Sequence, residues 1–173
     1  ELDGLEAGAV SEAELQQRLA AARERYLAAA KLLTLGRQQA ATALDRKVTG
    51  FMQALGMPGG VFATRVEAQD PPVFSTHGND EIEFLVSANP GQPPRPLAKV
   101  ASGGELSRIS LALQVAAVEA AHLPCLVFDE VDAGVGGAVA EMVGRQLHEL
   151  AAKGQVLCVT HLPQVASQSD HQL

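Results

Sequence analysis

The sequence has no tryptophan and few other aromatic residues, and together these make up 3% of its 173 residues. Aromatic platforms of the kind that stack on single-stranded nucleic acid are therefore not expected. The chain also has no glycine followed by lysine, a pair that the phosphate-binding loop G-x-x-x-x-G-K-[ST] requires. A complete loop of this type is excluded from the chain.

Cysteine is scarce as well, since the chain has only Cys125 and Cys158, each inside an apolar run typical of a strand. This pattern favours two buried thiols in a reducing compartment over a disulfide framework or a metal site. No apolar run approaches the ~20 residues that span a bilayer, and the amino end is acidic rather than basic and then apolar. We therefore expect a cytoplasmic protein.

Positive charge is in deficit, because 13 basic and 20 acidic residues give a formal net charge of −7. A broadly basic surface for phosphate groups is thus disfavoured. The acidity is concentrated after residue 50, while residues 1–50 carry equal numbers of both signs. The basic residues of that first segment could contact DNA or could solvate the face of a helix. They are Arg18, Arg23, Arg25, Lys31, Arg37, Arg46 and Lys47.

The first fifty residues predict a long helix, because residues 11–47 contain no proline and a single glycine. Their apolar positions alternate steps of four and three, which is heptad spacing. At about 1.5 Å per residue the helix is on the order of 50 Å long, so we expect a partner helix. An ordinary amphipathic helix lying on the domain is the alternative. The heptad positions are Leu15, Leu19, Ala22, Tyr26, Ala29 and Leu33.

The end of this helix predicts a domain boundary. Phe51, Met52 and Leu55 are expected to seat the helix on a globular part, and the glycine-rich residues 56–60 are expected to end it. We therefore predict a coiled-coil arm over residues 1–55 and a second domain over residues 56–173.

The first part of the second domain predicts a pair of strands. Residues 61–69 and 81–87 are rich in β-branched and apolar residues, and we expect them to pair in antiparallel fashion. Residues 89–96 hold four prolines, too many for a helix or a central strand, so we expect a connection there.

From residue 103 the pattern becomes that of an α/β fold. Helices are predicted over residues 103–121 and 137–152, and strands over residues 125–129 and 155–160. The apolar strands with a helix between them predict a β-α-β unit with buried parallel strands.

The helix at residue 103 begins with Ser102, Gly103, Gly104 and Glu105. Ser102 and Glu105 have the spacing of a capping box, which alone is a sufficient structural explanation. However, two adjacent glycines also leave backbone N–H groups open at a helix N-terminus, where a phosphate binds well.

Each of the two predicted parallel strands is followed by polar residues that suit nucleotide chemistry. Asp129 and Glu130 end the first strand, where one carboxylate can hold Mg²⁺ through water and the other can deprotonate an attacking water. His161 follows the second strand at the same sheet edge. A capping carboxylate, a solvated turn and a structural histidine are the simpler explanations of each residue alone. Asp132 lies in a turn that could be structural or could reach across a dimer.

At these residues the chain resembles the ATP-binding-cassette superfamily, with residues 102–105 as the signature motif, Asp129-Glu130 as Walker B, residues 131–134 as the D-loop and His161 as the switch histidine. More narrowly, it resembles the RecN family of bacterial SMC-like DNA-repair ATPases, through residues 89–91, 97–108 and 160–166. The resemblance covers nearly the whole chain. It implies the C-terminal lobe of an ATPase head, joined to the returning arm of a coiled coil.

The resemblance also implies a role for each site residue, with ATP held between two heads. Residues Ser102, Gly103, Gly104 and Glu105 would face the γ-phosphate bound on the opposite head, and Asp132 would lie across the dimer interface. Asp129 would serve Mg²⁺, Glu130 would activate water, and His161 would contact the γ-phosphate on its own head.

The implied whole protein is an ATPase of DNA double-strand break repair and recombination, associated with the nucleoid. Its partners would be a second copy, DNA, and an amino-terminal lobe that carries Walker A and the Q-loop. Because this chain lacks that lobe, we expect it to be inactive alone. A transporter's nucleotide-binding subunit is an alternative that the long helix disfavours, and a non-catalytic coiled-coil module is another.

Overall fold

The computed structural model describes residues 11–100, 103–121, 124–129, 131–132, 135–152 and 154–172. Its contacts divide the chain into two compact units, which we describe separately. The first consists of Glu1–Gln39 and Val66–Ile82, and the second of Ala40–Arg65 and Glu83–Leu173. The boundary between residues 55 and 56 that the sequence predicts stays a prediction.

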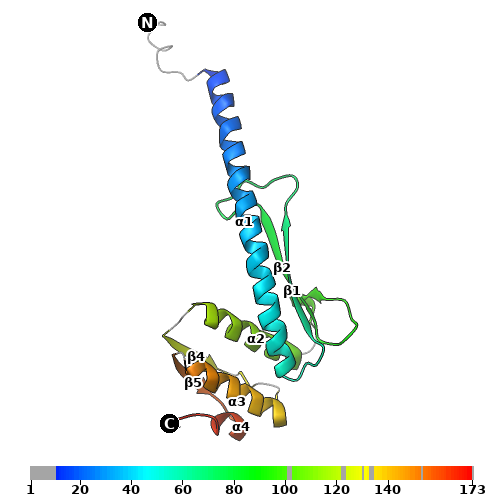
Figure 1. Ribbon diagram of the computed structural model, residues 1–173, viewed down its shortest axis with the longest axis vertical. Helices are drawn as coiled ribbons and strands as arrows, with labels where there is room; N and C mark the ends of the chain where they lie inside the picture. The colour runs from blue at the N-terminus through cyan, green and yellow to red at the C-terminus, as the bar shows by residue number, and fades with distance from the viewer. Residues whose placement is uncertain are drawn as a thin grey trace. The chain divides into compact units, whose positions relative to one another are not determined.

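The long helix is confirmed as α1, which runs over Glu12–Ala54 (Figure 1). Ser11 precedes it, and its Oγ accepts a hydrogen bond of 3.3 Å from the Glu14 N–H, as an N-cap serine does. At about 1.5 Å per residue the helix is about 65 Å long. Gly56, with φ of 79°, follows the last turn in the left-handed conformation that glycine adopts readily.

In the first unit, residues 66–82 pack against α1 through polar contacts. The Tyr26 hydroxyl donates a hydrogen bond of 2.8 Å to the Val73 carbonyl. The Asp80 carboxylate accepts bonds of 2.6 Å from Thr34 Oγ1 and 2.8 Å from Arg37 Nη1. The sequence predicts a polar connection here but not its attachment to the helix.

The predicted strand pair is confirmed as β1 (Val61–Ala68) and β2 (Asp80–Ser87), which are neighbours in one sheet. The Gln69 N–H, just after β1, donates to the Asn79 carbonyl, just before β2, so the two strands run in opposite directions. The sheet has a third strand, β3 (Arg95–Pro96), antiparallel to β2. It falls where the prolines predict a connection, and its two residues lie at the edge of the sheet, where proline is tolerated. A short 3-10 helix, η1 (Leu97–Lys99), follows.

The predicted β-α-β unit is confirmed in the second unit. Strands β4 (Cys125–Asp129) and β5 (Gln155–Val159) are parallel and paired in register, from Cys125 with Gln155 to Asp129 with Val159. The helices are α2 (Gly103–Ala121), α3 (Gly137–Ala151) and α4 (Pro163–Ala166). None of the helices in the described part is long and apolar enough to cross a bilayer.

The expectation that these parallel strands are buried is wrong for one face of the sheet. Val127, Leu157 and Val159 are 69%, 44% and 63% exposed, whereas Phe128 on the other face is 4% exposed. Side chains alternate between the two faces of a strand, and this chain covers only one of them. The buried thiol expected at Cys125 is wrong for the same reason, since Cys125 lies on the open face and is exposed, while Cys158 is half-buried.

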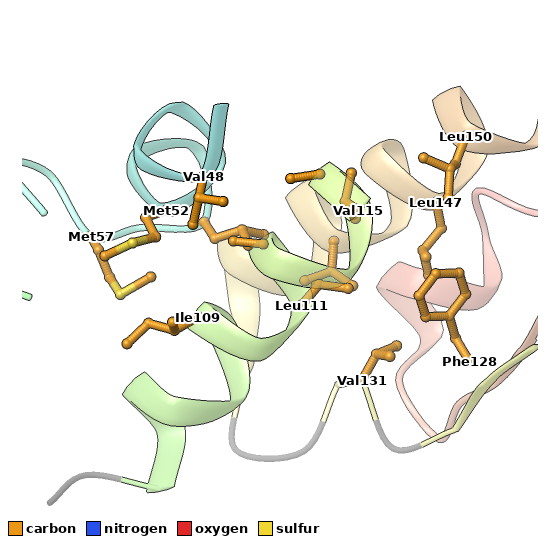
Figure 2. Packing of buried hydrophobic residues seen from close by; sticks show 14 of the residues in the cluster. Val48, Met52, Met57, Ile109, Leu111, Val115, Phe128, Val131, Leu147 and Leu150 are labelled. Carbon is orange, nitrogen blue, oxygen red and sulfur yellow. The ribbon is translucent and has the colours of Figure 1, made fainter. Parts of the chain in front are cut away.

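A hydrophobic core in the second unit joins the carboxyl-terminal part of α1 to α2 and α3 (Figure 2). Val48 and Met52 of α1 and Ile109 of α2 have no exposed surface. Leu55 is 1% exposed, and Phe51 packs against the cluster. The prediction that this end of the helix is seated on the globular part is therefore confirmed.

Candidate functional site

The carboxyl ends of β4 and β5 bring three of the predicted site residues to one edge of the sheet. Asp129 is the last residue of β4 and pairs in register with Val159, the last residue of β5. Thr160 and His161 therefore leave the sheet beside Asp129, and Asp132 returns to the same place after one turn. In α/β folds this edge is where ligands bind.

Asp132 is the centre of the hydrogen bonds at this edge, and it is only 2% exposed. Its Oδ2 accepts a hydrogen bond from Thr160 Oγ1 and one of 3.3 Å from the His161 N–H. Thr160 Oγ1 in turn accepts a bond of 3.1 Å from the Leu162 N–H. The turn that follows β5 is thus attached to the turn that follows β4.

The His161 ring is open to a ligand although its backbone is held. Its side chain is 75% exposed, and its Nδ1 lies 3.5 Å from Asp132 Oδ2. A histidine with a fixed backbone and an exposed ring is suited to contact a bound anion or a proton donor.

The electrostatics of the edge follow from its two aspartates. Burial by itself raises the pKa of Asp132, but the hydrogen bonds from Thr160 and from the His161 N–H, together with the nearby imidazole, outweigh it and hold that pKa below its usual value. Burial raises the pKa of Cys158, and the charges of Asp132 and Asp129 raise it further. The negative charge of both carboxylates therefore disfavours the thiolate form of Cys158, which is the nucleophilic form.

Of the two aspartates at this edge, Asp129 is the one that could serve a metal ion. It is exposed at the end of the strand, whereas Asp132 is buried and hydrogen-bonded. Within the ranges that the structure describes, no group of three or more His, Cys, Asp and Glu side chains could hold a metal. One carboxylate suits Mg²⁺, which keeps several waters and is often held by one or two carboxylates together with substrate phosphates.

The start of α2 is a second candidate site. Gly103 is exposed, and a Cβ added there would meet no atom within 4 Å, so its backbone is accessible to a ligand. Gly104 and Glu105 are half-buried. The N-terminus of a 19-residue helix suits a phosphate, because the helix dipole favours negative charge there.

Two predicted site residues, Ser102 and Glu130, lie outside the described residues, and so does Gly134 of the predicted D-loop. The capping box and the second Walker B carboxylate therefore stay predictions. Asp132 is described, with its carboxylate directed to Thr160 and His161 of its own chain. The hydrogen bond between Thr160 and Asp132 is not predicted from the sequence. No sequence pattern links an aspartate in the turn after β4 to a threonine hydroxyl after β5.

Comparison with known proteins identifies close relatives. The chain is 47% identical over 154 residues to the DNA repair protein RecN of Xylella fastidiosa (strain Temecula1 / ATCC 700964) and 49% identical over 148 residues to RecN of Vibrio cholerae. These matches cover 89% and 86% of the chain. The chain is a relative of RecN. It spans only 28% and 26% of the length of these two RecN proteins, and no family model matches it.

Solved structures show the same fold in SMC heads. An Smc head domain with an extended coiled coil, from Pyrococcus furiosus, matches 92% of the chain and 37% of its own length with a TM-score of 0.66 and 21% identity. A structure from work on ATP-driven dimerization and DNA-stimulated activation of SMC ATPases matches 79% of the chain and 78% of its own length, with a TM-score of 0.57 and 22% identity. The α/β fold, with its long amino-terminal helix, is that of part of an SMC-type head.

Proposed function

We propose that this chain is the C-terminal part of an SMC-like ATPase that acts in DNA double-strand break repair and recombination. In the complete protein, two heads hold ATP between them, hydrolyse it, and couple this cycle to DNA binding or to tethering of broken ends. The observation that carries the proposal is the grouping of Asp129, Asp132, Thr160 and His161 at one sheet edge, in a chain that is 47% identical to RecN.

Each site residue has a definite task in this proposal. Glu130 takes a proton from the water that attacks the γ-phosphorus, and His161 contacts the γ-phosphate bound on its own head. Asp129 would hold Mg²⁺, which when bound would supply positive charge against the phosphates. Ser102 and the amide groups of Gly103 and Gly104 meet the γ-phosphate bound on the other head. ATP is therefore the substrate of two half-sites on different copies.

The missing half of the nucleotide site belongs to an amino-terminal lobe of the same protein. The absence of any Gly-Lys pair in this chain supports this, because a P-loop must come from elsewhere. The open sheet face of Val127, Leu157 and Val159 supports it too, since the faces of parallel sheets are usually covered on both sides. This chain alone is accordingly inactive as an ATPase.

The arm has a second helix as its partner in the complete protein. Leu15 and Leu19 of the predicted heptad seam are 54% and 52% exposed, and Leu33 is 40% exposed. Leucines repeated at heptad spacing on one helix suit a coiled coil. The Smc head domain from Pyrococcus furiosus, which has the same fold, carries an extended coiled coil.

The substitution Ser102→Arg in the complete protein tests the two-headed arrangement. The arginine side chain would crowd the start of α2, where the phosphate held by the opposite head binds. We expect ATP-dependent dimers, measured by light scattering after size exclusion, to fall at least about tenfold. Ser110→Arg, at an exposed position further along α2, is the matched control and is expected to dimerise normally. Unchanged dimers in Ser102→Arg would contradict the assignment.

The DNA-repair assignment has its own discriminating observation. Salt-sensitive binding of DNA by the complete protein supports repair, because phosphate contacts release counterions and weaken as salt rises. Co-purification with a membrane permease would instead support a transporter subunit.

A further inference from the structure

We propose that Asp132 is a positioning residue for His161 of its own chain, acting through the backbone and through Thr160. This inference rests on the proposed function, because it takes His161 to be the residue that meets the γ-phosphate. It assigns to Asp132 a role within one head, whereas the family resemblance places this residue across the interface between two heads.

The first support is the direction of the Asp132 carboxylate. It is 2% exposed, and its Oδ2 accepts bonds from both Thr160 Oγ1 and the His161 N–H. A carboxylate that is buried and doubly bonded in its own chain has little surface left for a partner copy.

The second support is the contrast between the backbone of His161, which is held, and its ring, which is exposed. The backbone N–H donates into the interior, while 75% of the side chain stays exposed, with Nδ1 3.5 Å from Asp132 Oδ2. Thr160 Oγ1 extends the same network to the Leu162 N–H at 3.1 Å. Three consecutive residues after β5 are therefore tied, directly or through Thr160, to one carboxylate that follows β4.

The third support is chemical. Hydrogen bonds to an ionised acceptor are about twice as strong as neutral ones, and the bonds to Asp132 hold its pKa below the usual value, so the carboxylate stays charged at neutral pH. Catalysis depends on sub-ångström placement, and a displacement of about 1 Å of a contacting group can cost about 100-fold in rate. A single buried charge beneath His161 can supply that placement.

The deciding experiment uses mixed dimers of the complete protein, in which one copy carries Asp132→Asn and the other carries His161→Ala. If Asp132 serves its own chain, each nucleotide site has one defect, and we expect ATP turnover below about a tenth of wild type. If Asp132 serves the partner copy, both defects fall in one site and the other is intact. Turnover equal to that of a wild-type and His161→Ala mixed dimer would overturn the proposal.

A second measurement keeps the inference testable whatever the turnover shows. In the 173-residue chain, we expect Asp132→Asn and Thr160→Val to speed hydrogen exchange of the His161 amide at least about tenfold. Amides in the middle of α3 should not change, and Thr160→Ser, which keeps the hydroxyl donor, should restore slow exchange. Unchanged exchange at His161 would overturn the proposal.

The two measurements also separate this inference from the function on which it rests. If the complete wild-type protein does not hydrolyse ATP, or if His161→Ala turns over normally, the proposed function fails while hydrogen exchange still decides the positioning. If turnover behaves as expected but the His161 amide is unaffected by Asp132→Asn, the positioning fails and the function stands. In Asp132→Asn we further expect kcat, calculated per folded molecule, to fall about tenfold with KM nearly unchanged, because a loss of stability alone lowers only the folded fraction.

Discussion

At the scale of single residues, two buried aspartates fix two loops. Asp132 ties the turn after β5 to the turn after β4, and Asp80 ties residues 66–82 to α1. The Asp80 side chain has no exposed surface, and it accepts bonds from Thr34 and from Arg37, whose side chain is 25% exposed. In both places one carboxylate joins two segments that are far apart in sequence.

Removal of the Asp80 carboxylate should open its loop. We expect Asp80→Ala to cost about 2 kcal/mol, less than the loss of a fully buried pair because Arg37 keeps some contact with water. Hydrogen exchange of the Gln69 amide, which donates to the Asn79 carbonyl, should then be about 30-fold faster. Glu81→Ala, at an exposed neighbouring position, is the control and should change it less than twofold. Equal exchange in the two variants would contradict the role of Asp80.

The same residue gives the pH dependence a sign. Burial raises the pKa of Asp80, but bonds from Thr34 and Arg37 and the Arg37 charge outweigh this, so its pKa lies below 3.8 in the folded chain. A carboxyl group whose pKa is lower in the folded chain than in the unfolded chain stabilises the fold at any pH above its unfolded-chain pKa. This stabilisation is lost as the pH falls through the pKa of the folded chain. Unfolding free energies measured from pH 6 to 2 should therefore fall below pH 3.8, less steeply for Asp80→Asn. Asp132 contributes in the same direction.

At this scale the sequence predicts where the site residues stand but not how they are bonded. Asp129 and His161 could be placed because strand ends at one sheet edge follow from the β-α-β pattern. The bond from Thr160 to Asp132 could not, since it depends on the conformations of two turns. The attachment of Asp80 to Thr34 and Arg37 is missed for the same reason.

At the scale of elements, periodicity predicts the helices and strands well. α1 and α2 follow from apolar spacing and from the absence of proline, and β4 and β5 from short apolar runs. Burial on both faces of β4 and β5 is predicted wrongly, because an apolar run does not say which face is covered, and this chain supplies helices for one face only. The exposed Val127 is therefore an informative residue.

Substitution of Val127 tests what covers the open face. In the 173-residue chain, Val127→Lys should change the free energy of unfolding by less than about 0.5 kcal/mol, because the side chain is 69% exposed. In the complete protein we expect a loss of several kcal/mol, because the lysine would be buried without a partner. Phe128→Ala is the control and should cost about 3 kcal/mol or more in both, since Phe128 is 4% exposed here. A complete protein that tolerates Val127→Lys would contradict a covered face.

At the scale of the whole molecule, the chain is a relative of RecN that spans about a quarter of the length of the RecN proteins it matches. Its fold is that of part of an SMC head. In the proposed arrangement, the sheet edge with Asp129 and His161 serves one nucleotide and the start of α2 serves the nucleotide bound on the other head, while the amino-terminal lobe supplies the P-loop. This arrangement explains how a chain without a P-loop carries residues that ATP hydrolysis needs.

The most direct measurement is ATP turnover and head dimerisation of the complete protein with Glu130→Gln. The glutamine cannot take the proton of the attacking water but preserves the size of the side chain, so we expect hydrolysis to fall at least about 100-fold. ATP-held dimers should accumulate, because the phosphate contacts remain. Normal turnover in Glu130→Gln, or loss of hydrolysis without any gain in dimers, would contradict the account.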